Sequence, residues 1–146
     1  MFDWESNYSN KEHLSNSIEY LYFLANASLT LRVVKYLRQM SQLPVKFVTV
    51  IHQINGWAIL VKMSFPLTPQ QNGDLRAFLN ELGIPYQPPM RVKMALGCLE
   101  AGEPTLDVMR RYQVIIVSHG SPECSKIEDF CQELKSGLGY CPETLV

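Results

Sequence analysis

The sequence lacks the features that would direct it to a membrane, a secretory route or a nucleic acid. No apolar run approaches the roughly 18 residues that a membrane-spanning helix needs. The first ten residues, MFDWESNYSN, contain neither a basic stretch nor an apolar core, so we expect no signal peptide. The net charge is −1, from 13 basic and 14 acidic residues, and exerts no strong pull on phosphate backbones. We therefore expect a cytoplasmic protein with no membrane span.

A short basic stretch does not change the expectation that the chain binds no nucleic acid. Arg32, Lys35 and Arg38 are spaced to share one helix face, but such a strip is more often a solvated face than a binding site. A nucleic-acid-binding domain usually shows a concentrated basic footprint. We do not expect nucleic acid as a partner.

The chain has few charged residues and no short zinc-binding motif. Charged residues make up 18% of the chain, below the typical value of about 25%, and hydrophobic residues make up 47%, which favours burial in an interface. The four cysteines follow residue 97 and read as reduced thiols. His119, Cys124, Cys131 and Cys141 could supply four metal ligands, but their spacings match no short zinc motif. We expect no metal and no cofactor.

The most informative feature present is a β-hairpin over residues 45–65, VKFVTVIHQINGWAILVKMSF. Asn55-Gly56 joins two apolar runs and is typical of a two-residue type I′ turn. Counting outward from that turn places Ile54 opposite Trp57 and sets the register of the whole ribbon.

Both sides of this hairpin are apolar, which is unusual for an antiparallel pair with one face in water. The side that carries Trp57 is almost wholly apolar, and the other side still carries Phe47, Ile51 and Leu60. A helix layer or another subunit should cover this second side, because two strands alone are marginal in water. The candidate interface residues are Phe47, Ile51, Leu60 and Trp57.

Helical periodicity predicts the elements on either side of the hairpin. Apolar residues recur at helical spacing from Leu14 to Ala25 and from Val33 to Met40. Residues 10–42 could form one helix or two, and Asn26-Ala27-Ser28 is the favoured break because short polar side chains compete for backbone hydrogen bonds. Further helices are expected over residues 74–82, 90–101, about 104–112 and 121–138. Residues 90–101 could instead form a strand by alternation.

The C-terminal part predicts a strand followed by a helix. Residues 113–118, QVIIVS, read as a buried strand that adds to the hairpin sheet. Ser121 would cap the next helix, with Pro122 at its first position and Cys124 at the third. A thiol there can be activated by the helix dipole, and His119 could take its proton. In the simpler interpretation, Cys124 packs as a small hydrophobic residue.

Together these patterns predict a single α+β domain over residues 1–146. It has N-terminal helices, a central antiparallel hairpin extended by a C-terminal strand, and flanking helices. The leading functional hypothesis is a non-enzymatic cytosolic regulatory or adaptor protein, a homodimer that contacts another protein. The alternative is a small enzyme or an anion- or ligand-binding domain that uses the junction from His119 to Cys124.

Overall fold

The protein is built around one antiparallel sheet. A computed structural model describes residues 18–138, and the remaining residues at the two ends are not described. Within residues 18–138 the sheet has five strands in the order β4-β1-β3-β2-β5, and each neighbouring pair is antiparallel. The strands are β1 (Glu19–Leu24), β2 (Val45–Gln53), β3 (Gly56–Met63), β4 (Gly83–Pro85) and β5 (Ile115–Gly120).

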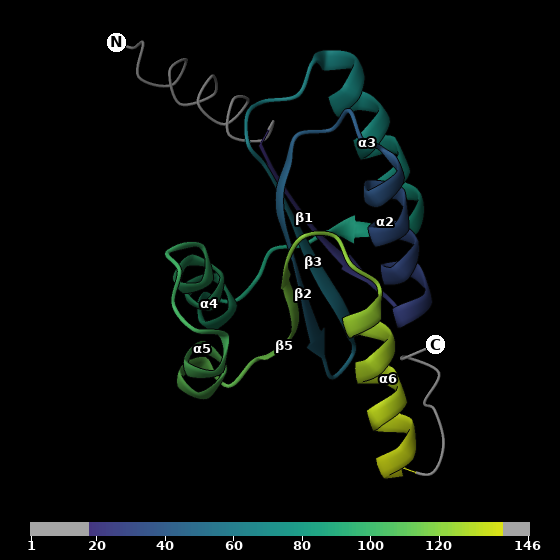
Figure 1. Cartoon of the computed structure of the whole chain (residues 1–146). Coiled ribbons are helices and arrows are strands. Elements are labelled where there is room, and N and C mark those ends of the chain that lie inside the picture. The colour runs from purple at the N-terminus through teal and green to yellow at the C-terminus, as the bar shows by residue number, and fades with distance from the viewer. Residues whose placement is uncertain (1–17, 139–146) are drawn as a thin grey trace.

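Helices cover both faces of this sheet, so the described chain has three layers (Figure 1). Among the described residues, one face of the sheet carries three helices and the other face carries two. This arrangement confirms the predicted α+β class. None of the helices within residues 18–138 combines the length and apolar composition needed to span a bilayer. The first face carries α2 (Ala27–Gln39), α3 (Pro69–Leu82) and α6 (Ser125–Leu138), and the second carries α4 (Met90–Glu100) and α5 (Thr105–Tyr112).

The two faces bury separate apolar cores. The larger core joins Trp57 and Ile59 of β3 to side chains of α2, α3 and α6. The smaller core joins Ile51 and Ala58 to side chains of α4, α5 and β5. The prediction that the second side of the hairpin is covered is confirmed, and the cover is a helix layer of the same chain.

The hairpin register differs from the predicted one by two residues. Gln53 lies opposite Gly56, so Ile54 and Asn55 form the loop and His52, rather than Ile54, faces Trp57. The predicted type I′ turn is wrong, because it needs positive φ at Asn55, which does not have it. Because the error is an even number of residues, the side chains from Phe47 to Lys62 keep their predicted faces. Val45, predicted on the side of Phe47, lies instead against the larger core, because a bulge between Val45 and Phe47 shifts the register.

Gly56 serves a close approach between strands rather than the turn itself. Its φ is +156°, and a Cβ there would lie 2.7 Å from the carbonyl oxygen of Leu24 and would run into the ring of Phe23. Glycine therefore allows the end of β1 to lie directly against the start of β3.

The predicted helix over residues 14–25 is wrong where the structure describes it, because residues 19–24 form β1. Tyr20, Tyr22 and Leu24 are buried in alternation, which is the period of a strand. The Tyr20 hydroxyl donates to Asn72 (2.7 Å) and the Tyr22 hydroxyl donates to Asn80 (2.8 Å), both on α3. Residues 10–17 of the predicted helix lie outside the described residues.

The predicted helix over Val33–Met40 is confirmed as α2, and it begins at the predicted break. Asn26 is its N-cap, and its side chain accepts a hydrogen bond from the backbone N–H of Leu29 at 2.9 Å. The start of α3 was predicted too far along the chain. This helix begins at Pro69 instead of Asp74, because Thr68 and Gln71 form a capping box.

The C-terminal elements are confirmed with shifted boundaries. Residues 90–100 are helical, which decides between the two predicted alternatives. The predicted strand over residues 113–118 is β5, which begins at Ile115 and pairs with β2 as expected. The last helix, α6, begins at Ser125 instead of Ser121.

Candidate functional site

The strand-to-helix junction does not place Cys124 where the sequence predicted. The backbone N–H of Glu128 donates to the carbonyl oxygen of Cys124 at 3.0 Å, so Cys124 precedes the first turn of α6 and is not its third residue. Its side chain is only 6% exposed and belongs to the larger core. Cys124 therefore packs as a small hydrophobic residue.

His119 lies on the opposite face of the sheet from Cys124. Its Nδ1 atom is 2.7 Å from Oγ1 of Thr49, and its ring lies 4.8 Å from the ring of Phe47. Thr49 alternates along β2 with Val48 and Val50, which point into the larger core. The sheet therefore separates His119 from Cys124, and the structure does not bring the two candidates together.

The surroundings of His119 predict a pH dependence of stability. Burial lowers the pKa of His119, and the negative charge of Glu100 only partly opposes this. The unfolded chain therefore binds a proton more readily, so stability should be present above about pH 6.5 and decrease as the pH falls through the lowered pKa. His52, whose pKa is also lowered by burial, acts in the same direction.

We expect His119→Asn to reduce this acid sensitivity, because asparagine can still bond Thr49 but does not titrate. The measurement is the melting temperature of both proteins at pH 7.5 and pH 5. The melting temperature of the variant should fall less on acidification than that of the parent, although His52 keeps part of the pH dependence. Equal losses would show that His119 is not the responsible group.

Glu100, the carboxylate that acts on His119, also pairs with a partly buried lysine of β3. Nζ of Lys62 lies 2.9 Å from Glu19 and 3.1 Å from Glu100, and the Lys62 side chain is only 14% exposed. Burial alone would lower the pKa of Lys62, but the bonds to the two carboxylates outweigh it and raise the pKa. This cluster joins the end of α4 to the sheet, and because it sets one ammonium against two carboxylates, it offers no free positive charge for an anionic ligand.

The structure gathers no metal site within residues 18–138. No group of three or more His, Cys, Asp or Glu side chains in that part of the chain lies close enough to hold an ion. His119 and Cys124 are on different faces, and Cys141 lies outside the described residues.

The four candidate interface residues are buried inside the chain. Trp57 is 0% exposed, Ile51 is 2% exposed, and Leu60 and Phe47 reach only 5% and 9%. Side chains this buried cannot contact another protein unless the sheet rearranges. The two helix layers cover the apolar side chains that suggested an interface, so a contact surface has to be found elsewhere.

The outer edge of β5 is such a surface. In the described part of the chain β5 pairs only with β2, so its other edge has no strand beside it. Proteins usually protect such edges with charged residues, proline or very short strands. The opposite edge strand follows this rule, because β4 has three residues and ends in Pro85. By contrast, β5 reads IIVSHG, without Lys, Arg, Asp, Glu or Pro, and its one irregularity is a bulge at Val117.

Exposed apolar side chains lie on β5 and on α4. Ile115, the first residue of β5, is 47% exposed. Met90 and Met94 are 68% and 48% exposed and lie one turn apart on α4, so they share a face. Exposed methionines adapt to different partner surfaces. Neither methionine was predicted from the sequence as a contact residue, although their spacing could have revealed them.

A second missed group surrounds Cys98. Its Sγ atom lies 3.5 Å from the hydroxyl of Tyr112 and 3.8 Å from Nη1 of Arg111, which also donates to Glu103 at 2.8 Å. Cys98 is only partly buried. Cys98 is therefore more accessible than Cys124 and lies among polar groups instead of in an apolar core.

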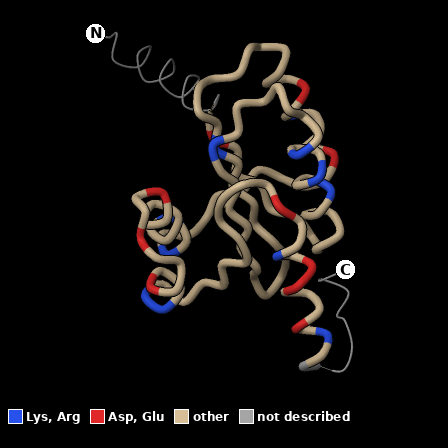
Figure 2. The backbone as a smooth tube through the Cα atoms, viewed as in Figure 1, with Lys and Arg blue, Asp and Glu red and all other residues tan. Residues whose placement is uncertain are grey.

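Charge is mixed over the described residues. Figure 2 shows basic and acidic positions interspersed along the helices, while the strands carry few of either. Arg32, Lys35 and Arg38 are exposed on α2, as a solvated helix face requires.

Compared with known protein families, curated proteins and solved structures, the chain gives no match. The function therefore has to be inferred from the geometry of the chain itself.

Proposed function

We propose that this chain is a non-enzymatic regulatory or adaptor protein of the cytoplasm that forms a homodimer and acts through contacts with another protein. The observation that carries the proposal is the outer edge of β5, which in the described part of the chain has no neighbouring strand, no charged residue and no proline. An edge of this kind is a template for pairing with another strand, and pairing through backbone hydrogen bonds does not require a deep apolar patch.

A second copy of the chain is the partner that we assign to this edge. Two β5 strands can pair antiparallel about a twofold axis, which presents the same residues on both sides and closes the assembly at two subunits. The product would be one continuous sheet across the dimer. Ile115, half exposed at the start of β5, would gain cover in that arrangement.

Contact with another protein is assigned to the exposed methionine face of α4. Met90 and Met94 lie on the helix layer opposite α6 and remain outside both cores. An adaptable apolar face on a helix suits recognition of a partner groove or helix.

The test of the dimer is a lysine on the edge strand. We expect the unaltered protein to show a mass near twice 16.7 kDa by light scattering at micromolar concentration. Ile115→Lys should raise the dimer dissociation constant at least tenfold, because a charge on an edge strand opposes pairing.

Ile84→Lys is the matched control. Ile84 is 63% exposed and lies on β4, the other edge strand, so the same change there should leave the mass doubled. A parent protein with the mass of one chain, or an Ile115→Lys variant that dimerises as well as the parent, would contradict the proposal.

A further inference from the structure

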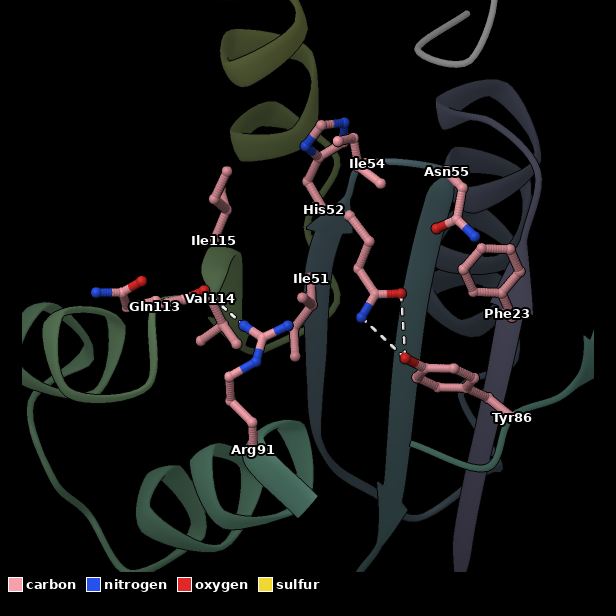
Figure 3. A pocket seen from close by; sticks show the side chains of 11 residues that line it. Phe23, Ile51, His52, Ile54, Asn55, Tyr86, Arg91, Gln113, Val114 and Ile115 are labelled. Carbon is pink, nitrogen blue, oxygen red and sulfur yellow. Dashed lines mark hydrogen bonds between the residues drawn. The ribbon is translucent and has the colours of Figure 1, made fainter. Parts of the chain in front are cut away.

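A pocket lies at the hairpin end of the sheet, where segments distant in sequence meet (Figure 3). It has a volume of about 370 Å³, at the lower end of the range of about 300–1,000 Å³ for small-molecule sites. The end of β1, the β2–β3 turn, the segment after β4, the first turn of α4 and residues 113–115 all contribute to it.

One wall of the pocket is aromatic and part of its lining is aliphatic. The rings of Phe23 and Tyr86 lie 5.5 Å apart between centroids, tilted by 41°. Ile51 and Val114, both buried, line the side toward the smaller core. Gly56 leaves room for the Phe23 ring, as described above. This arrangement suits a flat apolar body such as an aromatic ring.

A neutral polar pair lies beside the aromatic wall. Nε2 of Gln53 donates to the hydroxyl of Tyr86 at 2.9 Å, and that hydroxyl lies 3.2 Å from Oε1 of the same amide. Figure 3 marks both of these interactions at the Tyr86 hydroxyl with dashed lines. The pair can exchange one of these bonds for a bond to a hydroxyl group of a ligand.

Arg91 supplies the only formal charge among the described residues that line the pocket. Its Nη1 donates to the carbonyl oxygens of Gln113 (2.7 Å) and Tyr112 (3.2 Å), which fixes the side chain at the pocket. A guanidinium has five N–H donors, and those on Nε and Nη2 are not used in these bonds. No acidic side chain within residues 18–138 forms an ion pair with Arg91.

We propose that this pocket binds a small aromatic carboxylate. The planar guanidinium of Arg91 matches a carboxylate in shape and charge, and one cation balances one negative charge. The ring of the ligand would lie against Phe23 and Tyr86, and a hydroxyl on that ring would meet the Gln53–Tyr86 pair. A phosphate monoester fits less well, because it carries close to two charges at neutral pH and the pocket offers a single cation.

The test compares binding of 4-hydroxyphenylacetate, the probe, with binding of its uncharged analogue, 4-hydroxyphenylacetamide. Binding is followed through the backbone amide NMR chemical shifts of the full-length protein. We expect saturable shifts at residues 51–55 and 113–115 with the acid, and binding at least tenfold weaker with the amide. This comparison needs no variant, so it decides the proposal even if a substitution unfolds the protein.

Variants then locate the charge. Arg91→Gln should weaken binding of the acid at least tenfold, and Arg91→Lys should weaken it less because it keeps the charge but loses the planar fork. Arg110→Gln, an exposed arginine on α5 outside the pocket lining, is the matched control and should bind as the parent does.

Three results with the unaltered protein would overturn the proposal. They are the absence of saturable shifts with the acid, equal binding of the acid and the amide, and displacement of the acid by inorganic phosphate at similar concentration. A folded Arg91→Gln variant with unchanged affinity would do the same. None of these outcomes is a measurement of mass, so failure of the pocket proposal is distinguishable from failure of the dimer proposal.

Discussion

Replacing Trp57 with alanine should reduce the free energy of unfolding by about 3–5 kcal/mol, the usual cost of truncating a fully buried large aromatic residue. Trp57 is 0% exposed, and its ring makes edge contacts with His52 (4.9 Å between centroids) and with Phe130 of α6 (5.8 Å). The alanine variant would leave a cavity where β3 meets α6. Urea unfolding followed by far-UV circular dichroism measures the loss.

Phe65→Ala provides the control for this change. Phe65 follows β3 closely and is 61% exposed, so its truncation should change stability by no more than about 0.5 kcal/mol. The loss at Trp57 should not depend on protein concentration, since its contacts are within one chain. A loss below about 1 kcal/mol, or one that appears only in dilute protein, would mean that Trp57 is an interface residue as first predicted from the sequence.

Gly56→Ala should destabilise the protein strongly for so small a substitution. A φ of +156° is a conformation that alanine adopts at a cost of roughly 1–3 kcal/mol. The added Cβ would also lie 2.7 Å from the carbonyl oxygen of Leu24, so β1 and β3 would have to move apart. We expect a total loss of at least about 2 kcal/mol, measured by the same urea unfolding experiment.

The matched control is Gly73→Ala in α3. A Cβ at Gly73 meets nothing within 4 Å, and its backbone is helical. Alanine there should stabilise the protein by about 0.5–1 kcal/mol, because it lowers the entropy lost on folding. If Gly56→Ala were as harmless as Gly73→Ala, the close approach of β1 to β3 would be wrong.

The sequence predicted the faces of the hairpin better than its turn. Alternation decides which side chain lies on which face, and an error of two residues in register does not alter that assignment. The turn was misjudged because Asn55-Gly56 has the composition of a type I′ loop, whereas Gly56 is needed for contact with Phe23. That contact joins residues far apart in the chain and leaves no local signal.

The strand β1 was predicted as a helix because its sequence fits both the helical period and the alternation of a strand. Its apolar residues can be arranged at helical spacing, but Tyr20, Tyr22 and Leu24 also alternate, and the segment EYLYFL is rich in strand-forming aromatics. Tertiary contacts decide the matter, since β1 is paired on both edges by β3 and β4. The aromatic content was the available signal in favour of a strand.

The candidate site could be predicted only in part. The strand before His119 was expected, but its position at the sheet edge depends on the strand order, which sequence patterns do not supply. The pocket depends on Phe23, Gln53, Tyr86 and Arg91 meeting through the fold. Cys124 looked like a reactive thiol because Ser121 and Pro122 resemble a helix start, but α6 begins at Ser125.

Hydrogen exchange along β5 tests the central claim most directly. In an antiparallel edge strand, alternate backbone N–H groups point away from β2 and are protected only if another strand pairs with them. We expect the outward amides of residues 115–120 to be protected in concentrated protein and to lose that protection on dilution and in Ile115→Lys. Outward amides that exchange at the same unprotected rate at every concentration would contradict pairing through β5.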